Sequence, residues 1–207
     1  MSAPLLIVNP SSGRERAGEQ AGPLSAALEP HFGPLDVFET AGDGDAFEAA
    51  RGAVARECDT IFVAGGDGTL NEAVNGVWEA GGLGRVRFGV VPLGTGNDFA
   101  SALGVPASVE DAVRIFAAGR ELVVDLGLVN GRLFLNASGG GYIAEVSVAV
   151  TPQLKTVAGR LAYLIGGAQA LLEYEPVRAT IRAEPGDIRI GLGLYTFAVC
   201  NSRLIGG

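Results

Sequence analysis

The stretch that decides the fold is Thr60-Ile-Phe-Val-Ala-Gly-Gly-Asp-Gly-Thr-Leu-Asn-Glu72. Its first five residues are apolar or β-branched, which predicts a strand buried in a sheet. The glycines of Gly65–Thr69 predict a tight turn, and apolar residues at helical spacing predict a helix over Leu70–Glu79. A strand, a glycine turn and a helix in succession are typical of a parallel sheet covered by helices.

The same alternation extends over the first part of the chain. Further strands are predicted at Pro4–Val8, Leu35–Glu39 and Val86–Val91. Further helices are predicted at residues 15–29, ending near Pro30, and at Asp45–Cys58, with Asp43 or Asp45 as the N-cap. A variant capping box, Ser108-Val-Glu-Asp111, opens a last helix that Gly119 ends. We therefore expect an α/β fold with a parallel-sheet domain over residues 1–121.

After residue 121 the pattern changes to antiparallel strands. Asn130-Gly131 is a strong two-residue hairpin signal between Leu122–Val129 and Leu133–Asn136. A helix is predicted at about Gln153–Glu173, followed by a second antiparallel pair, Val177–Ala183 and Ile188–Cys200. Residues 122–207 are thus predicted to form part of a mostly antiparallel β domain. Its last apolar strand has nothing after it to pair with, so we expect this domain to be truncated.

The net charge and the near absence of lysine limit the kinds of ligand and partner that the protein can bind. The net charge is −8, from 15 basic and 23 acidic residues, and no basic stripe is visible. Nucleic acid is therefore excluded as a partner, and strong electrostatic adsorption to an anionic membrane is not expected. Lys155 is the only lysine, so a phosphate-binding loop ending in Gly-Lys-Ser/Thr cannot be present.

Cysteine usage and hydropathy indicate the compartment. Cys58 and Cys200 are far apart, and with the single histidine, His31, they match no zinc-site spacing, so we expect ordinary buried thiols. No signal peptide is recognisable at the start of the sequence. The longest apolar stretches, Leu161–Leu172 and Ile190–Cys200, are shorter than the roughly 18 residues of a membrane span. We expect a soluble, cytoplasmic protein.

Polar, glycine-rich loops follow three of the predicted strands. They are Asn9-Pro-Ser-Ser-Gly13, Gly65-Gly-Asp-Gly-Thr69 with Asn71 and Glu72, and Pro92-Leu-Gly-Thr-Gly-Asn-Asp98. The carboxyl ends of parallel strands meet at one edge of a sheet, where ligands bind. Glycine N–H groups, a helix N-terminus and the hydroxyls of Thr69 and Thr95 suit phosphate. Asp67 would repel phosphate unless it holds Mg²⁺, directly or through water.

Each loop by itself has a plainer interpretation. Asn9–Gly13 could be a turn with an N-cap, Asp67 an ordinary turn residue, and Asn97 and Asp98 the cap of a following helix. Gly94–Phe99 imitates a dinucleotide-binding fingerprint but has Phe99 where a small residue is needed. The combination of the three loops is what favours a nucleotide site.

In this order the loop motifs resemble those of the diacylglycerol kinase catalytic-domain family, above all its bacterial soluble lipid kinases. The second half is similar as well, through Phe134-Leu-Asn136, Gly139-Gly-Gly141, Leu154-Lys-Thr156, Gly159 and Leu161-Ala-Tyr163. The resemblance implies an N-terminal Rossmann-like domain, like that of NAD kinases and phosphofructokinases, and a mostly antiparallel β domain. ATP and lipid would meet between the two domains.

The resemblance also implies site residues and cofactors. ATP and Mg²⁺ are the implied cofactors, and Asp67 is the implied catalytic residue and metal ligand. The residues implied to bind ATP are Asn9, Thr40, Gly65, Gly66, Asp67, Gly68, Thr69, Leu70, Asn71 and Thr95, and those implied near the substrate are Asn97 and Asp98. The family's general base and its other metal ligands would lie beyond residue 207, so we expect residues 1–207 alone to be inactive.

The implied activity is ATP-dependent transfer of the γ-phosphoryl group to a lipid hydroxyl, with diacylglycerol giving phosphatidic acid. The implied partners are the lipid, the membrane in transient peripheral contact, and a second copy of the chain, since family members often form homodimers. Two alternatives stay open at this stage. One is an NAD kinase, which would use the same Gly65–Thr69 loop, and the other is a nucleotide-binding module without turnover.

Overall fold

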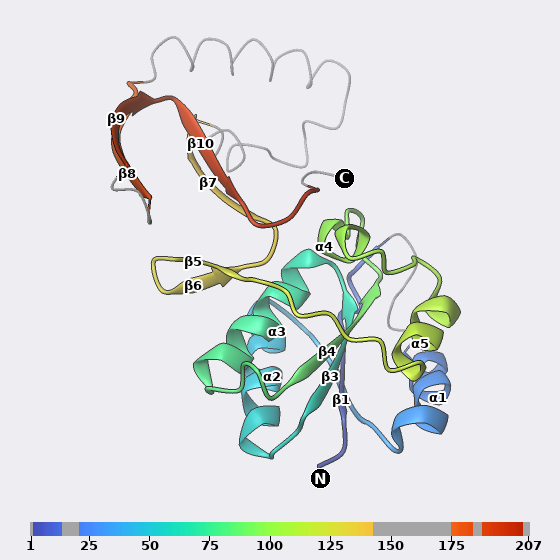
Figure 1. Cartoon of the computed structure of the whole chain (residues 1–207). Coiled ribbons are helices and arrows are strands. Elements are labelled where there is room, and N and C mark those ends of the chain that lie inside the picture. Colours follow the sequence, from blue (N-terminus) through green and yellow to red (C-terminus); the bar gives the residue numbers. More distant parts are fainter. Residues whose placement is uncertain (1, 14–20, 143–174, 184–187, 205–207) are drawn as a thin grey trace. The chain divides into compact units, whose positions relative to one another are not determined.

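The computed structural model describes residues 2–13, 21–142, 175–183 and 188–204 (Figure 1). The chain forms two compact units. The first comprises Met1–Asn136 and Asn201–Gly207, and the second comprises Ala137–Cys200.

A four-stranded parallel sheet forms the centre of the first unit. Its strands are β1 (Leu5–Val8), β2 (Asp36–Glu39), β3 (Thr60–Gly65) and β4 (Arg87–Pro92), in the order β2-β1-β3-β4. Every neighbouring pair in this sheet is parallel. The predicted α/β fold is therefore confirmed, with strand bounds that differ from the prediction by one residue.

Helices cover both faces of this sheet, as Figure 1 shows. One face, with Leu5, Ile7, Ile61 and Val63, packs against α2 (Asp45–Ala55) and α3 (Asp67–Glu79). The other face, with Leu6, Val8, Phe62 and Ala64, packs against α1 (Ala21–Phe32) and α5 (Val109–Ala117). Successive strand residues point to opposite faces, so the continuous apolar strands found here are what a doubly covered sheet needs.

Several helix ends differ from the sequence prediction, and one of them is the end of α2, which lies at Ala55 rather than Cys58. α3 begins at Asp67 rather than Leu70, so three of the five residues of Gly65–Thr69 lie in its first turn. Asp43 and Asp45 are not the N-cap of α2; Gly44 takes that position, with φ of 87°. α1 continues through Pro30 to Phe32, where it was expected to end near the proline. By contrast, Ser108 does cap α5, accepting from the Asp111 N–H at 3.3 Å.

The predicted hairpin at Asn130-Gly131 is confirmed, but its strands are shorter than the predicted Leu122–Val129 and Leu133–Asn136. β5 (Gly127–Val129) pairs antiparallel with β6 (Arg132–Phe134), and both turn residues have positive φ. The Asn75 side chain of α3 holds β6: its Oδ1 accepts from the Leu133 N–H at 2.9 Å and its Nδ2 donates to the Leu133 carbonyl at 3.0 Å. The first compact unit therefore extends to Asn136, whereas a domain boundary near residue 121 stays a prediction.

The second unit contains antiparallel strand pairs. β7 (Ala137–Gly141) pairs with β10 (Thr196–Cys200), and β8 (Val177–Ala183) pairs with β9 (Ile188–Leu194). The prediction of one strand over Ile188–Cys200 is wrong, because the chain bends at Tyr195 and its two halves pair with different partners. The predicted helix at Gln153–Glu173 lies outside the described residues.

The two cysteines differ in environment. Cys58 is buried and its Sγ lies 3.1 Å from the Thr60 carbonyl, but Cys200 on β10 is exposed, so the expectation of two buried thiols is wrong for Cys200.

Over the described part of the chain, none of the helices combines the length and apolar character needed to cross a bilayer.

Candidate functional site

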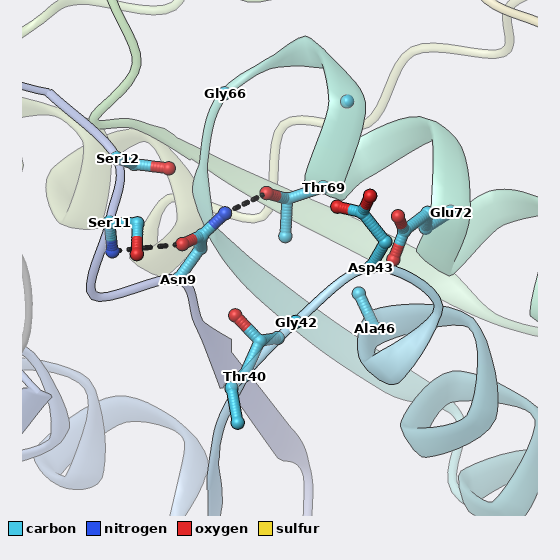
Figure 2. Close-up of a pocket in the computed structure, with 12 residues that line it drawn as sticks. Asn9, Ser11, Ser12, Thr40, Gly42, Asp43, Ala46, Gly66, Thr69 and Glu72 are labelled. Atoms are coloured by element: carbon cyan, nitrogen blue, oxygen red, sulfur yellow. Dashed lines mark hydrogen bonds between the residues drawn. The ribbon is translucent and has the colours of Figure 1, made fainter.

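A cavity of about 310 Å³ opens at the carboxyl ends of β1, β2 and β3. Strand order reverses between β1 and β3, because β2 lies on one side of β1 and β3 on the other. This is the position where ligands bind in open α/β sheets. The cavity is lined by Asn9, Ser11, Ser12, Thr40, Ala41, Gly42, Asp43, Ala46, Gly66, Gly68, Thr69 and Glu72 (Figure 2).

Asn9 ties the loop after β1 to the start of α3. Its side-chain Nδ2 donates to Thr69 Oγ1 at 2.9 Å, and its Oδ1 accepts from the Ser11 N–H at 2.9 Å. Figure 2 shows both bonds. Because Thr69 Oγ1 accepts from Asn9, the Thr69 hydroxyl keeps its own proton to donate to a ligand.

The N-terminal end of α3 faces this cavity. Its N-cap is Gly66, which has no side chain to bond the first N–H groups of the helix. Gly68 and Thr69 in the first turn also line the cavity. Unpaired N–H groups and the helix dipole favour an anion at such a position. The first turn of α3 is therefore suited to a phosphate group.

Asp67 does not line the cavity, although it belongs to the same turn. Its carboxylate accepts from the N–H groups of Asp98 at 2.9 Å and Phe99 at 3.0 Å, and from Asn136 Nδ2 at 3.2 Å. It thereby binds the N-terminus of α4 (Asp98–Ala102). Donors on both carboxylate oxygens suit a structural cap of α4.

The glycine loop after β4 packs directly on the glycine loop after β3. Asn97 closes this second loop, because its Oδ1 accepts from the Gly94 N–H at 2.9 Å and its Nδ2 donates to the Gly94 carbonyl at 2.6 Å. A Cβ at Gly94 would lie 2.6 Å from Gly66 Cα, so only glycine permits this approach. The loop after β4 therefore supports the loop after β3 by backbone contact.

Comparison with known proteins now decides the family. The family described as the diacylglycerol kinase catalytic domain matches residues 3–129. The chain belongs to the diacylglycerol kinase catalytic domain family.

Its relatives carry the same name. A diacylglycerol kinase of Bacillus subtilis (strain 168) is 36% identical over 203 residues, which cover 98% of this chain and 66% of the relative. One of Staphylococcus carnosus (strain TM300) is 34% identical over 95% of this chain and 64% of the relative. A crystal structure of a diacylglycerol kinase from Bacillus anthracis str. Sterne superposes with a TM-score of 0.71 and 27% identity, covering 97% of this chain and 64% of that one. The chain thus spans slightly less than two thirds of the length of these relatives.

In this member of the diacylglycerol kinase family, only some of the residues that were predicted to bind ATP line the cavity. Asn9, Thr40, Gly66, Gly68 and Thr69 line it. The others lie elsewhere: Gly65 and Leu70 are buried, Asn71 has a buried Oδ1 without a partner among the described residues, and Thr95 is exposed. Asn97 and Asp98 lie in the second glycine loop and at the start of α4, outside the cavity lining. Their roles toward nucleotide or substrate stay predictions.

The turn between β2 and α2 contributes lining residues that were not singled out as site residues. Gly42, Asp43 and Ala46 come from this region, and Glu72 reaches the cavity from α3. The glycines on either side of Asp43 were the available signal in the sequence. Asp43 and Glu72 are the charged residues in the described lining and both are acidic, so attraction for an anion would come from N–H groups rather than from basic side chains.

Among the residues that the structure describes, no three His, Cys, Asp or Glu side chains gather as a metal site. Mg²⁺ at Asp67 stays a prediction, and no catalytic step is routed through it.

Proposed function

We propose that this chain is the nucleotide-binding part of an ATP-dependent lipid kinase that transfers the γ-phosphoryl group to a lipid hydroxyl. The observation that carries the proposal is the first turn of α3, which presents Gly66, Gly68 and Thr69 to a cavity at the switch point of the sheet. Membership of the diacylglycerol kinase family supplies the reaction class.

The chemistry assigned to these residues is binding and positioning. The N–H groups of the α3 first turn would stabilise phosphate charge, and the Thr69 hydroxyl would donate to a phosphate oxygen. Asn9 holds that hydroxyl in place through its 2.9 Å bond. In phosphoryl transfer, positioning and charge stabilisation account for most of the catalysis, and the Mg²⁺ that accompanies ATP supplies further charge.

Diacylglycerol is the first acceptor to test, because the relatives at 36% and 34% identity are named for it. The product would be phosphatidic acid. Transient membrane contact, a homodimer and a general base beyond residue 207 belong to the same proposal. The family match favours a lipid acceptor over NAD.

The test is transfer of radiolabelled phosphate from ATP to dispersed diacylglycerol with Mg²⁺, with NAD as a parallel acceptor. It compares residues 1–207 with the longer reading frame that would contain them. We expect both proteins to bind ATP and the longer frame alone to transfer phosphate to lipid.

Transfer to NAD in place of lipid would overturn the lipid assignment. ATP binding without transfer to any lipid by the longer frame would favour a binding module. Absence of ATP binding would overturn the nucleotide site itself.

A further inference from the structure

The turn that joins β2 to α2 is braced from two sides. The Asp45 carboxylate accepts from the N–H groups of Ala41 at 2.7 Å and Gly42 at 2.9 Å. Glu72 of α3 accepts from the Gly44 N–H at 3.1 Å through its Oε2. Hydrogen bonds to carboxylates are stronger than those between neutral groups, so the turn is held in one shape before any ligand arrives.

The braced turn presents Asp43 to the cavity. Asp43 is exposed and lines the cavity, whereas Asp45 and Glu72 are engaged with backbone N–H groups of the turn. Figure 2 shows Ser11 and Ser12 on one side of the cavity and Asp43 and Glu72 on the other. The cavity therefore has one side with the hydroxyls of Ser11 and Ser12 and another side with carboxylate acceptors, and Thr69 of the α3 first turn lies between them.

This asymmetry orients a nucleotide. Phosphates are repelled by carboxylates and belong at the N–H groups of α3. A carboxylate is an acceptor, so the group opposite Asp43 must bring donors. The sugar that bears the phosphates of a ribonucleotide also carries neighbouring 2′- and 3′-hydroxyls, and a carboxylate can accept hydrogen bonds from both.

We infer that Asp43 accepts hydrogen bonds from the sugar hydroxyls of the bound nucleotide and makes the site selective for ribonucleotides. The inference rests on the proposed function and extends it to sugar recognition. The inference also explains why the turn is acidic, because the carboxylates of Asp45 and Glu72 fix the shape of the turn that presents the Asp43 carboxylate to the cavity.

The test is a set of ligand comparisons on residues 1–207 by isothermal titration calorimetry. ATP, 2′-deoxy-ATP, 3′-deoxy-ATP and inosine triphosphate are titrated into the wild type and into Asp43→Ala. For the wild type we expect ATP to bind about tenfold or more tightly than at least one deoxy analogue, the effect of losing a bond to a charged acceptor. In Asp43→Ala the same ratio falls to within about twofold, because the acceptor is gone.

Because the affinities for ATP and for a deoxy analogue are compared within the same protein, general effects of charge and folding cancel in their ratio. Glu39→Gln is the matched control. Glu39 ends β2, is exposed and does not line the cavity, so its substitution removes a nearby charge and must leave the ratio unchanged. An unchanged ratio in Asp43→Ala, or a wild type that binds ATP and both deoxy analogues equally, overturns the inference while the proposed function stands. The inference is also overturned if Asp43→Ala changes the preference for ATP over inosine triphosphate instead of the preference for ATP over the deoxy analogues, because Asp43 would then contact the base. It is likewise overturned if Asp43→Ala weakens the binding of all these nucleotides equally and only when Mg²⁺ is present. A wild type that binds none of these nucleotides overturns both.

Discussion

At Gly68 the fold tolerates a side chain, whereas the proposed ligand in the cavity does not. It lies in the first turn of α3, lines the cavity, and a Cβ at this position would meet no atom within 4 Å. The fold therefore has room for a side chain here, but that side chain would occupy space that the proposed phosphate needs.

We expect Gly68→Ala to leave the free energy of unfolding unchanged or to raise it by about 0.5–1 kcal/mol, since alanine favours helix. ATP affinity should fall at least about tenfold, a loss of about 1.4 kcal/mol of binding free energy. Urea unfolding and calorimetric titration measure the two effects. Gly22→Ala in α1, where a Cβ also meets nothing, is the control and should retain full ATP affinity.

Asp67 holds together parts of the first unit that are far apart in the sequence. Its carboxylate accepts from residues 31, 32 and 69 positions away along the chain. Asp67→Asn would place an amide NH₂ against at least one of these donors, so we expect a loss of about 1–3 kcal/mol in the free energy of unfolding. Urea unfolding followed by circular dichroism measures it. A loss of ATP affinity at unchanged stability would contradict the structural role and restore the predicted role at the phosphates.

Sequence reasoning placed the glycine loops after β1, β3 and β4, where the structure has them, but it did not anticipate that the Asp67 carboxylate binds the N-terminus of α4. The motif Gly65–Thr69 predicts a phosphate-binding turn from local chemistry alone. The partners of the Asp67 carboxylate come from α4 and from Asn136, and no local pattern announces such distant donors. The same limit explains why Asp43 was not singled out, since its place in the cavity depends on the packing of α2 against α3.

At the scale of elements, the contact between α2 and α3 depends on one glycine. A Cβ at Gly76 in α3 would collide with the Phe47 carbonyl of α2, so the two helices can approach this closely only with glycine there. The buried alanines Ala46, Ala50 and Ala53 on α2 belong to the same core cluster. This close packing sets the position of the turn that carries Asp43.

We expect Gly76→Ala to lower the free energy of unfolding by about 1–3 kcal/mol through overpacking, although alanine favours helix. Thermal or urea unfolding measures the change. Gly52→Ala in α2 is the matched control, because its Cβ would meet only the flexible end of Arg56 at 3.4 Å, and it should be neutral or stabilising. Equal effects of the two substitutions would refute the packing argument.

Strand partners were the part of the fold that the sequence predicted least well. Alternating runs identified β8 and the hairpin of β5 and β6, whose turn chemistry is local. The apolar run Ile188–Cys200 gave no sign of the bend at Tyr195, because its division follows from β10 pairing with β7 rather than with β8. β7 itself, Ala137–Gly141, is mostly glycine and has no strand signature.

At the scale of the whole molecule, the second unit is inserted into the first. The chain leaves the first unit after Asn136 and returns at Asn201, and the Asn201 N–H donates to the Asn136 carbonyl at 2.7 Å. The Asn201 side chain fastens this junction by donating to the carbonyls of Asp125 at 2.7 Å and Leu135 at 2.9 Å.

We therefore expect a chain in which a short glycine linker replaces residues 137–200 to fold and to unfold cooperatively, because its two ends already meet in the first unit. Circular dichroism and urea unfolding test this, and calorimetry should find ATP affinity within about threefold of that of residues 1–207, a difference of about 0.7 kcal/mol. The same deletion carrying Asn201→Ala is the comparison and should be less stable by about 1–2 kcal/mol, because bonds to two carbonyls are lost. A deletion chain without a cooperative transition would show that the first unit depends on residues 137–200.

Adjacent entry and exit points also have an evolutionary consequence. A gene segment encoding residues between Asn136 and Asn201 can be lengthened, shortened or replaced while the reading frame on either side still encodes the same sheet and the same glycine loops. Selection can then change the inserted unit without rebuilding the part that is proposed to bind the nucleotide. Diversification within such a lineage would be expected to concentrate its insertions and deletions in that interval, with the flanking asparagines retained as the fixed ends of a cassette.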